Sequence, residues 1–600
     1  MTKQSKQAVA SAREVRAEVR AIQQKPRAQV VIIGGGINGL GTFRDLALQG
    51  VDVVLVERGD YASGASSASS HMIHGGIRYL ENGEFRLVRE SVAERNGLLT
   101  TAPHYVKPLR TTIPIFSTFS GILAAPLRFL THKQGRIVER GAFLIKLGLS
   151  LYDSFSRDGG TVPRHVFHGR ARSRQELPLL NRDAKYTATY FDASVHEPER
   201  LALDVLLDGL AAGATGAGTS AATGGDAGGS ARAANYVEAI GVTDGGVRVR
   251  DLVGGGEFTI TADVVINASG PWTDLTNAAL ASETAYMGGT KGSHIVLDNP
   301  QLLAACAGRE MFFENGDGRI VLIYPLRGRV MVGTTDLDAN IHEPAVCTDE
   351  EIDYFIDLVA HVFPTVTIDR SQIVFRFSGI RPLPKHDDTQ PGFVSRDYRI
   401  VPTKPAGLGG GTVLSLVGGK WTTFRAVAEH LSGEAMELLG RRRTVSTRGL
   451  AIGGGRNYPM TDAARASWIA AYGGSVGRER ADQLLARYGT RARAVIDFLE
   501  EYDDEPLAST NEFSTGELVF IAENEFVVHV ADVLLRRTSV AFDGNVTAAV
   551  VEEVSRVLAS PLGWSEQTRQ DEVIQARAVL AQSHGILFES VEERSVKHGG

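Results

Sequence analysis

The most regular pattern of apolar and polar positions lies near the start of the chain. Residues 30–33 and 51–56 are short apolar runs, and residues 40–49 between them repeat apolar positions at a helical period. Nearly continuous apolar runs of this kind are typical of strands buried on both faces, as in a parallel sheet covered by helices. The same character predicts further elements: strands at 236–240, 263–267 and 414–417, and helices at 201–210 and 424–439.

A second pattern fills the region between residues 294 and 377. Four segments there alternate apolar and polar side chains, which is typical of strands with one buried and one open face. They lie at 294–297, 319–324, 329–332 and 373–377. We therefore predict an antiparallel sheet inserted into the domain of the buried strands.

The pattern changes again beyond about residue 445, where apolar residues recur at helical spacing, as at Leu484, Leu485 and Tyr488. The rest of the chain is predicted to be a helical domain. Residues 1–26 are polar and predict a helix or a disordered lead-in. Residues 211–235 are rich in Ala, Gly, Ser and Thr, which predicts a flexible surface insertion without a core.

Composition narrows the class of protein. Six hundred residues are more than a single hydrophobic core usually organises, so several domains are expected. The 63 basic and 70 acidic residues leave a formal charge of −7, which gives no general attraction to nucleic acid. Cys306 and Cys347 lack metal-ligand spacing, so we predict no metal site, no disulfide framework and a reduced, cytoplasmic setting. No apolar run is long enough to span a bilayer, and no signal-peptide core is present.

A glycine motif joins the first predicted strand to the first helix. Gly34, Gly36 and Gly39 have the spacing G-x-G-x-x-G, with Asn38 in the same turn. The three glycines permit a tight turn, close backbone approach to a pyrophosphate, and packing of the helix on the strand. Glu57, at the end of the second strand, can accept hydrogen bonds from ribose hydroxyls. The unit predicts an adenine dinucleotide site and leaves NAD and FAD open.

Three further segments favour FAD. Residues 66–80 follow the second strand with small hydroxyl residues and glycines, which let the chain run beneath a planar ligand and offer donors to phosphate. Residues 267–272 and 418–424 likewise place small residues directly after buried strands. Backbone N–H groups in the last segment can stabilise a reduced flavin. The candidate cofactor contacts are Ser69, Ser70, His74, Gly75, Gly76, Gly270, Gly419 and Thr422.

Cations stand in or beside the same loops. Arg78, Arg381, Arg396 and Lys420 together suggest an anionic substrate, because the arginine fork suits phosphate or carboxylate. Each of them alone fits a surface ion pair equally well. His294 begins a strand of the inserted sheet and can either accept the hydroxyl proton of a substrate or simply hydrogen-bond to substrate or flavin.

Taken together, these motifs resemble the FAD-dependent glycerol-3-phosphate dehydrogenases of the aerobic bacterial and mitochondrial type. The resemblance is carried by residues 33–39, 66–80, 84–89, 267–272, 291–295, 333–336, 378–383, 395–398 and 418–424, and by 532–538 in the helical tail. It implies an α/β fold. The FAD-binding domain would be of the Rossmann type (glutathione-reductase-like or DAAO-like), with an inserted antiparallel β-sheet substrate domain and a C-terminal α-helical domain.

The resemblance also implies an activity. The chain would oxidise sn-glycerol 3-phosphate to dihydroxyacetone phosphate by hydride transfer from C2 to flavin N5, and pass electrons to a membrane quinone. Arg381 would clamp the phosphate, and the pocket would be completed by Arg78, Tyr79, Arg396, His294 and Lys420. The protein would be cytoplasmic and peripherally attached to the inner face of the cell membrane. An anionic membrane surface and a second copy of the chain, as a homodimer, are further candidate partners.

The predicted domain organisation follows from these motifs. Residues 1–27 form a polar extension, 28–110 the first part of the FAD-binding domain, and 111–200 a substrate- or membrane-facing insertion. Residues 201–275 form the second part of the FAD-binding domain, 276–400 the substrate-binding sheet, 401–442 the last FAD-binding part, and 443–600 the helical domain.

Some features depart from the family pattern or leave alternatives open. His71 stands where lysine is common, and residues 195–200 replace a usual pair of aspartates. Residues 111–150 fit either an interfacial membrane surface or a buried helix pair. The rival functions are an oxidase that passes electrons to oxygen and releases peroxide, an amino-acid or hydroxy-acid oxidase, which the arginines disfavour, and a non-catalytic flavoprotein.

Overall fold

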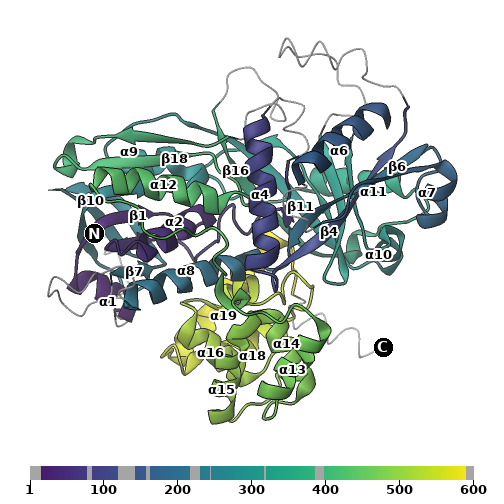
Figure 1. The fold of residues 1–600 in the computed structure, drawn as a ribbon. Coiled ribbons are helices and arrows are strands. Elements are labelled where there is room, and N and C mark those ends of the chain that lie inside the picture. Colours follow the sequence, from purple (N-terminus) through teal and green to yellow (C-terminus); the bar gives the residue numbers. More distant parts are fainter. Residues whose placement is uncertain are drawn as a thin grey trace, which may run out of the picture.

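The computed structural model describes residues 15–76, 84–118, 142–156, 162–215, 230–243, 245–315, 319–385 and 397–588. Two sheets lie side by side, and a helical domain packs below them (Figure 1). The predicted fold class is confirmed: a parallel sheet with helices, a second sheet that is mainly antiparallel, and a C-terminal set of helices.

The first sheet is built from the predicted apolar runs. Its central strands run parallel, and its order is β17-β18-β10-β1-β2-β7, with the hairpin β8–β9 attached to β10. The strands are β1 (Arg27–Ile33), β2 (Val53–Val56), β7 (Ala231–Ala234), β8 (Val237–Thr243), β9 (Gly246–Asp251), β10 (Glu257–Asn267), β17 (Arg399–Thr403) and β18 (Thr412–Val417).

Both faces of this sheet are covered, which explains the nearly continuous apolar runs. Val30 and Ile32 face helices α2 (Ile37–Leu48), α8 (Pro198–Thr215) and α12 (Phe424–Leu438). The alternate residues Val31 and Ile33 pack on the other face, against α1 (Ala17–Gln24) and the β8–β9 hairpin. The predicted lead-in therefore contains a helix, α1, that belongs to the core, because its residues Val19 and Ile22 are fully buried.

The prediction of a flexible insertion at 211–235 is wrong at both ends. α8 extends to Thr215, and β7 adds a buried parallel strand beside β2. The small residues allow helix and strand to approach closely, since a Cβ built on Gly213 would lie 2.4 Å from the Cβ of Ala231. The middle of the tract, 216–229, lies outside the described residues.

The second sheet is ten-stranded, in the order β15-β11-β14-β13-β12-β4-β6-β3, with β16 on β11 and β5 on β6. Its pairs are antiparallel except β4 with β12. The strands are β3 (Met72–Ile73), β4 (Val106–Ile115), β5 (Val166–Gly169), β6 (Tyr186–Val195), β11 (Met287–Leu297), β12 (Glu310–Glu314), β13 (Ile320–Leu326), β14 (Arg329–Gly333), β15 (Leu337–Asp338) and β16 (Ile373–Pro384). The predicted domain boundary at residue 110 thus falls inside β4.

Helices cover this second sheet and the junction between the sheets (Figure 1). They are α4 (Phe85–Thr101), α6 (Ala142–Ser156), α7 (Arg170–Glu176), α10 (Pro300–Cys306) and α11 (Asp349–Val362), whereas α9 (Thr273–Ala279) packs on the first sheet against β8, β10 and β18. Among the described residues, no helix is long and apolar enough to cross a membrane.

The C-terminal domain shares a core with the second sheet. Phe375 and Val296 pack in one cluster with Val530, Val550 and Leu580. Its helices are α13 (Asp462–Tyr472), α14 (Arg478–Tyr488), α15 (Ala492–Glu501), α16 (Thr515–Asn524), α17 (Val530–Asp532), α18 (Ala548–Ala559) and α19 (Glu566–His584). A short π-helical turn, Val533–Arg537, continues α17.

A substitution at the third glycine of the motif, Gly39, tests why α2 can lie so close to β1. A Cβ added at Gly39 would lie 2.0 Å from the carbonyl oxygen of Gly34, so backbone must shift. We expect Gly39→Ala to lower the free energy of unfolding of the apo-protein by about 2 kcal/mol or more, measured by urea denaturation. Gly97→Ala in α4 is the matched control. It meets no atom within 4 Å and should stabilise by about 0.5–1 kcal/mol. Equal effects of the two changes would contradict this account.

Candidate active site

The glycine turn and the 418–424 segment meet at the N-terminus of α2. Gly34 has φ +115° and lies against Ala268, where a Cβ would come within 2.6 Å of the carbonyl oxygen. Gly36 caps α2 without a side-chain partner, and Gly419 faces the amide of Asn38. Asn38 Oδ1 is buried and has no partner among the described residues. The backbone N–H groups and the absence of Cβ atoms fit a pyrophosphate, whereas the open amide oxygen of Asn38 can accept a hydrogen bond only from an N–H or hydroxyl group of a ligand.

Glu57 is held at the end of β2 by two backbone donors. Its Oε2 accepts the N–H of Gly35 at 2.6 Å, and its Oε1 accepts the N–H of Gly59 at 2.8 Å. Burial raises the pKa of Glu57, and these two bonds oppose that rise by stabilising the carboxylate. Each oxygen retains further acceptor capacity for a ribose hydroxyl.

The hydroxyl-rich loop continues from there to the second sheet. Ser70 Oγ lies 2.8 Å from His294 Nε2, and Ser69 Oγ accepts the N–H of His71 at 3.3 Å. The loop then forms β3 and reaches His74, Gly75 and Gly76, of which Gly76 has φ +78°. These predicted cofactor contacts therefore lie on one continuous stretch between the two sheets.

A buried carboxylate that sequence reasoning missed supports the end of this loop. Asp192, on β6, accepts the N–H of Gly75 at 3.0 Å, the hydroxyl of Tyr152 at 2.6 Å and a guanidinium N–H of Arg95 at 2.8 Å. A Cβ on Gly75 would lie 2.1 Å from the Tyr152 hydroxyl oxygen. No local motif marks Asp192, because its partners come from α4, α6 and the loop.

A second missed residue, Ser66, ties the loop to both glycine segments. Its Oγ accepts the N–H of Ile37 in the first turn of α2 at 3.0 Å, and its carbonyl accepts the indole N–H of Trp421 at 2.9 Å. Its place in the hydroxyl-rich run was a signal that could have identified it.

His294 and Arg381 lie on the same face of the second sheet. In the β11–β16 register His294 pairs with Phe377, and Arg381, four residues further along β16, pairs with Thr290. The rings of His294 and Phe377 stack at 4.7 Å with an interplanar angle of 9°. Burial lowers the pKa of His294 well below its usual range, and the positive charge of Arg381 adds to this effect. The ring is therefore neutral, and its buried Nδ1 has no partner among the described residues.

Arg381 is oriented by three oxygen atoms. It donates to Thr334 Oγ1 at 2.8 Å, to the carbonyl of Thr335 at 2.9 Å and to Asp336 Oδ1 at 3.0 Å. Its guanidinium lies over Gly292, where a Cβ would come within 2.1 Å of a guanidinium nitrogen. About a fifth of the Arg381 side chain is exposed (21%), so the structure holds it in place without burying it.

The remaining predicted residues flank this face. Gly270, with φ +61°, opens a turn after β10, and Gly418 and Gly419 have φ +88° and +108° after β18. Thr422 is buried, and Lys420 is half-buried near Glu90 of α4. Three predicted substrate residues, Arg78, Tyr79 and Arg396, lie outside the described residues. In the described part, no group of three or more His, Cys, Asp or Glu side chains is arranged to hold a metal.

Comparisons with known proteins show the family to which the chain is similar. A family described as FAD dependent oxidoreductase matches residues 29–424, and one described as the C-terminal domain of alpha-glycerophosphate oxidase matches residues 445–569. A glycerol-3-phosphate dehydrogenase of Synechocystis is 32% identical over 90% of this chain and 93% of its own length. The aerobic glycerol-3-phosphate dehydrogenase of Bacillus subtilis is 28% identical over 90% and 92%.

A solved structure shares the fold over nearly the whole length. The glycerol-3-phosphate dehydrogenase of Bacillus halodurans, complexed with FAD, matches with a TM-score of 0.70 at 21% identity, covering 94% of this chain and 97% of the other.

Proposed function

The chain belongs to the family of FAD-dependent glycerol-3-phosphate dehydrogenases and oxidases, and from this membership we propose that it oxidises sn-glycerol 3-phosphate to dihydroxyacetone phosphate, with hydride passing from C2 to flavin N5. The observation that carries the proposal is the placement of a neutral histidine and an oriented arginine on one sheet face, beside the loop that leads from Glu57. The C2–O bond needs a proton acceptor, and the phosphate needs a cation.

FAD is the cofactor, and the residues at its site fit it. We propose that Gly34, Gly36, Asn38 and Gly39 hold the pyrophosphate, that Glu57 holds the ribose, and that the other predicted contacts lie along the flavin: Ser69, Ser70, His74, Gly75, Gly76, Gly270, Gly419 and Thr422. When bound, FAD supplies the hydride acceptor. The absence of Cβ atoms at the glycine turn supports this placement.

Arg381 is the proposed phosphate clamp. Asp336, Thr334 and the Thr335 carbonyl hold its guanidinium plane still, so little side-chain entropy is lost when an anion binds. Arg78, Tyr79, Arg396 and Lys420 complete the proposed substrate pocket. A charged cluster of this kind favours a phosphate ester over a neutral alcohol.

His294 is the proposed proton acceptor. A base must be unprotonated in the free enzyme, and burial keeps this ring neutral. Its Nε2 contacts the Ser70 hydroxyl, and its Nδ1 has no protein partner in the described part of the chain. The stack on Phe377 holds the ring plane, so the orientation of both nitrogens is set before substrate arrives.

We propose a membrane quinone as electron acceptor, with the protein cytoplasmic and peripherally attached to the inner face of the membrane. Support comes from α6, where Phe143, Leu147 and Leu151 recur every four residues and expose 56%, 60% and 42% of their surface. Such a stripe suits a membrane interface. The alternative acceptor is oxygen, with release of hydrogen peroxide. A homodimer is also compatible with this arrangement.

The experiment that tests the function is anaerobic addition of sn-glycerol 3-phosphate to the purified holoenzyme. We expect bleaching of the oxidised flavin absorbance, with dihydroxyacetone phosphate formed in equal amount. Neutral glycerol and amino acids should not bleach it at the same concentration. An unchanged flavin spectrum would overturn the proposal in favour of a non-catalytic flavoprotein or another substrate. Reoxidation by a soluble quinone rather than by oxygen, monitored as peroxide yield, separates the two acceptors.

Arg381→Ala is expected to raise KM for glycerol 3-phosphate about tenfold to a hundredfold, since a charge-assisted contact contributes about 1.5–3 kcal/mol. Steady-state kinetics with an artificial dye measures this. Arg329→Ala is the matched control: it removes another arginine of the second sheet, which pairs with Asp298 and donates to the carbonyl of Asp543, and should leave KM within about twofold. An unchanged KM in Arg381→Ala would exclude Arg381 as the clamp.

His294→Gln keeps a neutral hydrogen-bonding group but removes the base. We expect the rate constant of anaerobic flavin reduction at saturating substrate to fall by about 10²–10⁴. Stopped-flow absorbance measures it. A loss of less than about tenfold would instead assign His294 a hydrogen-bonding role only.

A further inference from the structure

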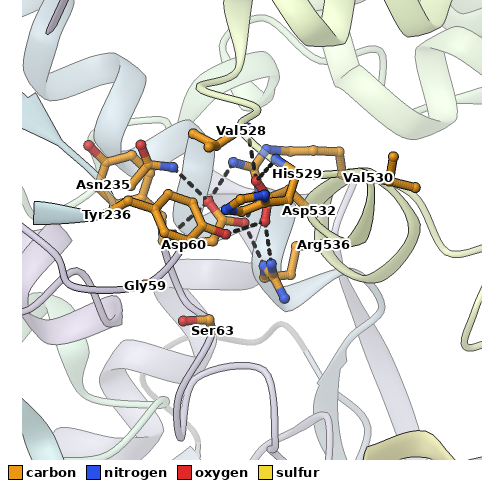
Figure 2. Close-up of polar contacts among 12 residues, drawn as sticks. Gly59, Asp60, Ser63, Asn235, Tyr236, Val528, His529, Val530, Asp532 and Arg536 are labelled. Carbon is orange, nitrogen blue, oxygen red and sulfur yellow. Dashed lines mark hydrogen bonds and ion pairs between the residues drawn. The ribbon is translucent and has the colours of Figure 1, made fainter. Parts of the chain in front are cut away.

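The loop that carries Glu57 is also held from the C-terminal domain, through Asp60. This carboxylate is fully buried, three residues after Glu57, and lies against Arg536 and Arg537 at the end of the π-helical turn. Arg537 donates to both carboxylate oxygens, at 2.7 and 2.8 Å, and Arg536 donates through Nε. Figure 2 shows Asp60 at the centre of this group of polar contacts.

The two arginines are themselves fixed. Arg536 also donates to Asp532 at 2.6 Å, and Asp532 accepts the backbone N–H groups of Val528 and His529 at 2.9 Å. Arg537 donates through Nε to the carbonyl of Glu525 at 2.9 Å. Burial opposes ionisation of Asp60, but the two guanidinium groups outweigh it and hold the pKa of that carboxyl well below its usual range.

The same contacts reach the neighbouring strand end. Asn235, directly after β7, donates to Asp60 at 3.1 Å and to the carbonyl of Phe526 at 2.9 Å. The Tyr236 hydroxyl donates to Asp532 at 2.6 Å, while its backbone N–H donates to the carbonyl of Gly59 (Figure 2). The carboxyl ends of β2 and β7, which flank Glu57, are thus both attached to residues 525–537.

The ion-paired attachment lies at this end of the loop, and further along the ring of His71 packs against Phe542 of the C-terminal domain. Between these two contacts, loop residues 63–65, 67 and 68 line a cavity of about 490 Å³ whose other walls include Arg536 and Phe542. Before Ser63 the loop closes back on the glycine turn, because Ala62 donates to the carbonyl of Gly35 and Glu57 accepts from Gly35. Movement of Asp60 would therefore displace Glu57 and Gly35 together.

We propose that Asp60, Arg536 and Arg537 are positioning residues for the cofactor, through which the C-terminal helical domain holds the adenosine end of the FAD site. The inference rests on the proposed placement of the adenosine ribose beside Glu57. It gives the Asp532–Thr538 run of the helical tail a role in cofactor retention. It also requires reciprocity, since FAD binding must in turn stabilise the contact of residues 528–537 with the loop.

The test titrates full-length apo-protein with FAD and measures binding by flavin fluorescence. We expect Asp60→Asn to raise the Kd for FAD at least tenfold, because the isosteric amide removes the charge that two guanidinium groups require. Arg536→Lys keeps the charge but loses the Nε contact, and should raise the Kd by a smaller factor of at least threefold. Asp543→Asn is the matched control. It breaks another ion pair made by the C-terminal domain, with the partly exposed Arg327 between β13 and β14, and should leave the Kd within twofold.

A second readout separates this role from general destabilisation. ADP, used as a competitor of FAD, should lose affinity in Asp60→Asn by the same factor as FAD. Hydrogen exchange of residues 528–537 should slow on FAD binding in the wild type but not in Asp60→Asn. The proposal is overturned if Asp60→Asn and Arg536→Lys both bind FAD within twofold of wild type, or if FAD weakens while ADP does not.

These readouts do not involve substrate. If Asp60→Asn does not fold, Arg536→Lys and wild-type hydrogen exchange decide the question, and absence of any FAD effect on residues 528–537 overturns it. Failure of glycerol 3-phosphate to bleach the flavin would refute the proposed function and leave the FAD-affinity result unaffected.

Discussion

Three carboxylates hold the loop on which the site depends. Asp60 and Asp192 are buried, where an unpaired charge would cost several kcal/mol, Glu57 is half-buried, and each of the three charges is compensated differently. Glu57 accepts hydrogen bonds from backbone N–H groups, and Asp60 accepts them from two guanidinium groups. Asp192 accepts hydrogen bonds from an arginine, a tyrosine and the N–H of Gly75. The loop from residue 57 to 76 is thereby attached in turn to the parallel sheet, the C-terminal domain and the second sheet.

The second sheet carries the two residues to which we assign proton transfer and phosphate binding. His294 and Arg381 are 87 positions apart in the numbering of the chain, yet the antiparallel register of β11 and β16 places them on one face. Both side chains fit on this face because glycines stand next to them. Gly292 lies under the arginine, and Gly333 lies beside the histidine, where a Cβ would come within 2.2 Å of the ring. An imidazole of lowered pKa and a fixed cation then lie on one face, as the proposed oxidation of an alcohol that carries an anion requires.

Most of the elements followed from local pattern, and the errors share one cause. Apolar runs identified β1, β10 and β18, and alternation identified the core of β11, β13, β14 and β16. The Ala-rich strand β7 was missed because alanine has low strand propensity, and its burial depends on β2 and α8, which lie far away in sequence. α1 was left without a role for the same reason, since Val19 and Ile22 are only two apolar residues in a polar stretch.

The sequence by itself determined the class of cofactor and predicted the kinds of groups at its site, because glycine spacing and hydroxyl-rich loops carry their chemistry locally. Tertiary structure alone decided which groups meet. The neutrality of His294 comes from burial, the orientation of Arg381 from Thr334 and Asp336, and the link from Asp60 to Arg536 from contacts across 476 positions. Charge state and ion pairing depend on distance and solvent exclusion, and neither is encoded at any single position of the chain.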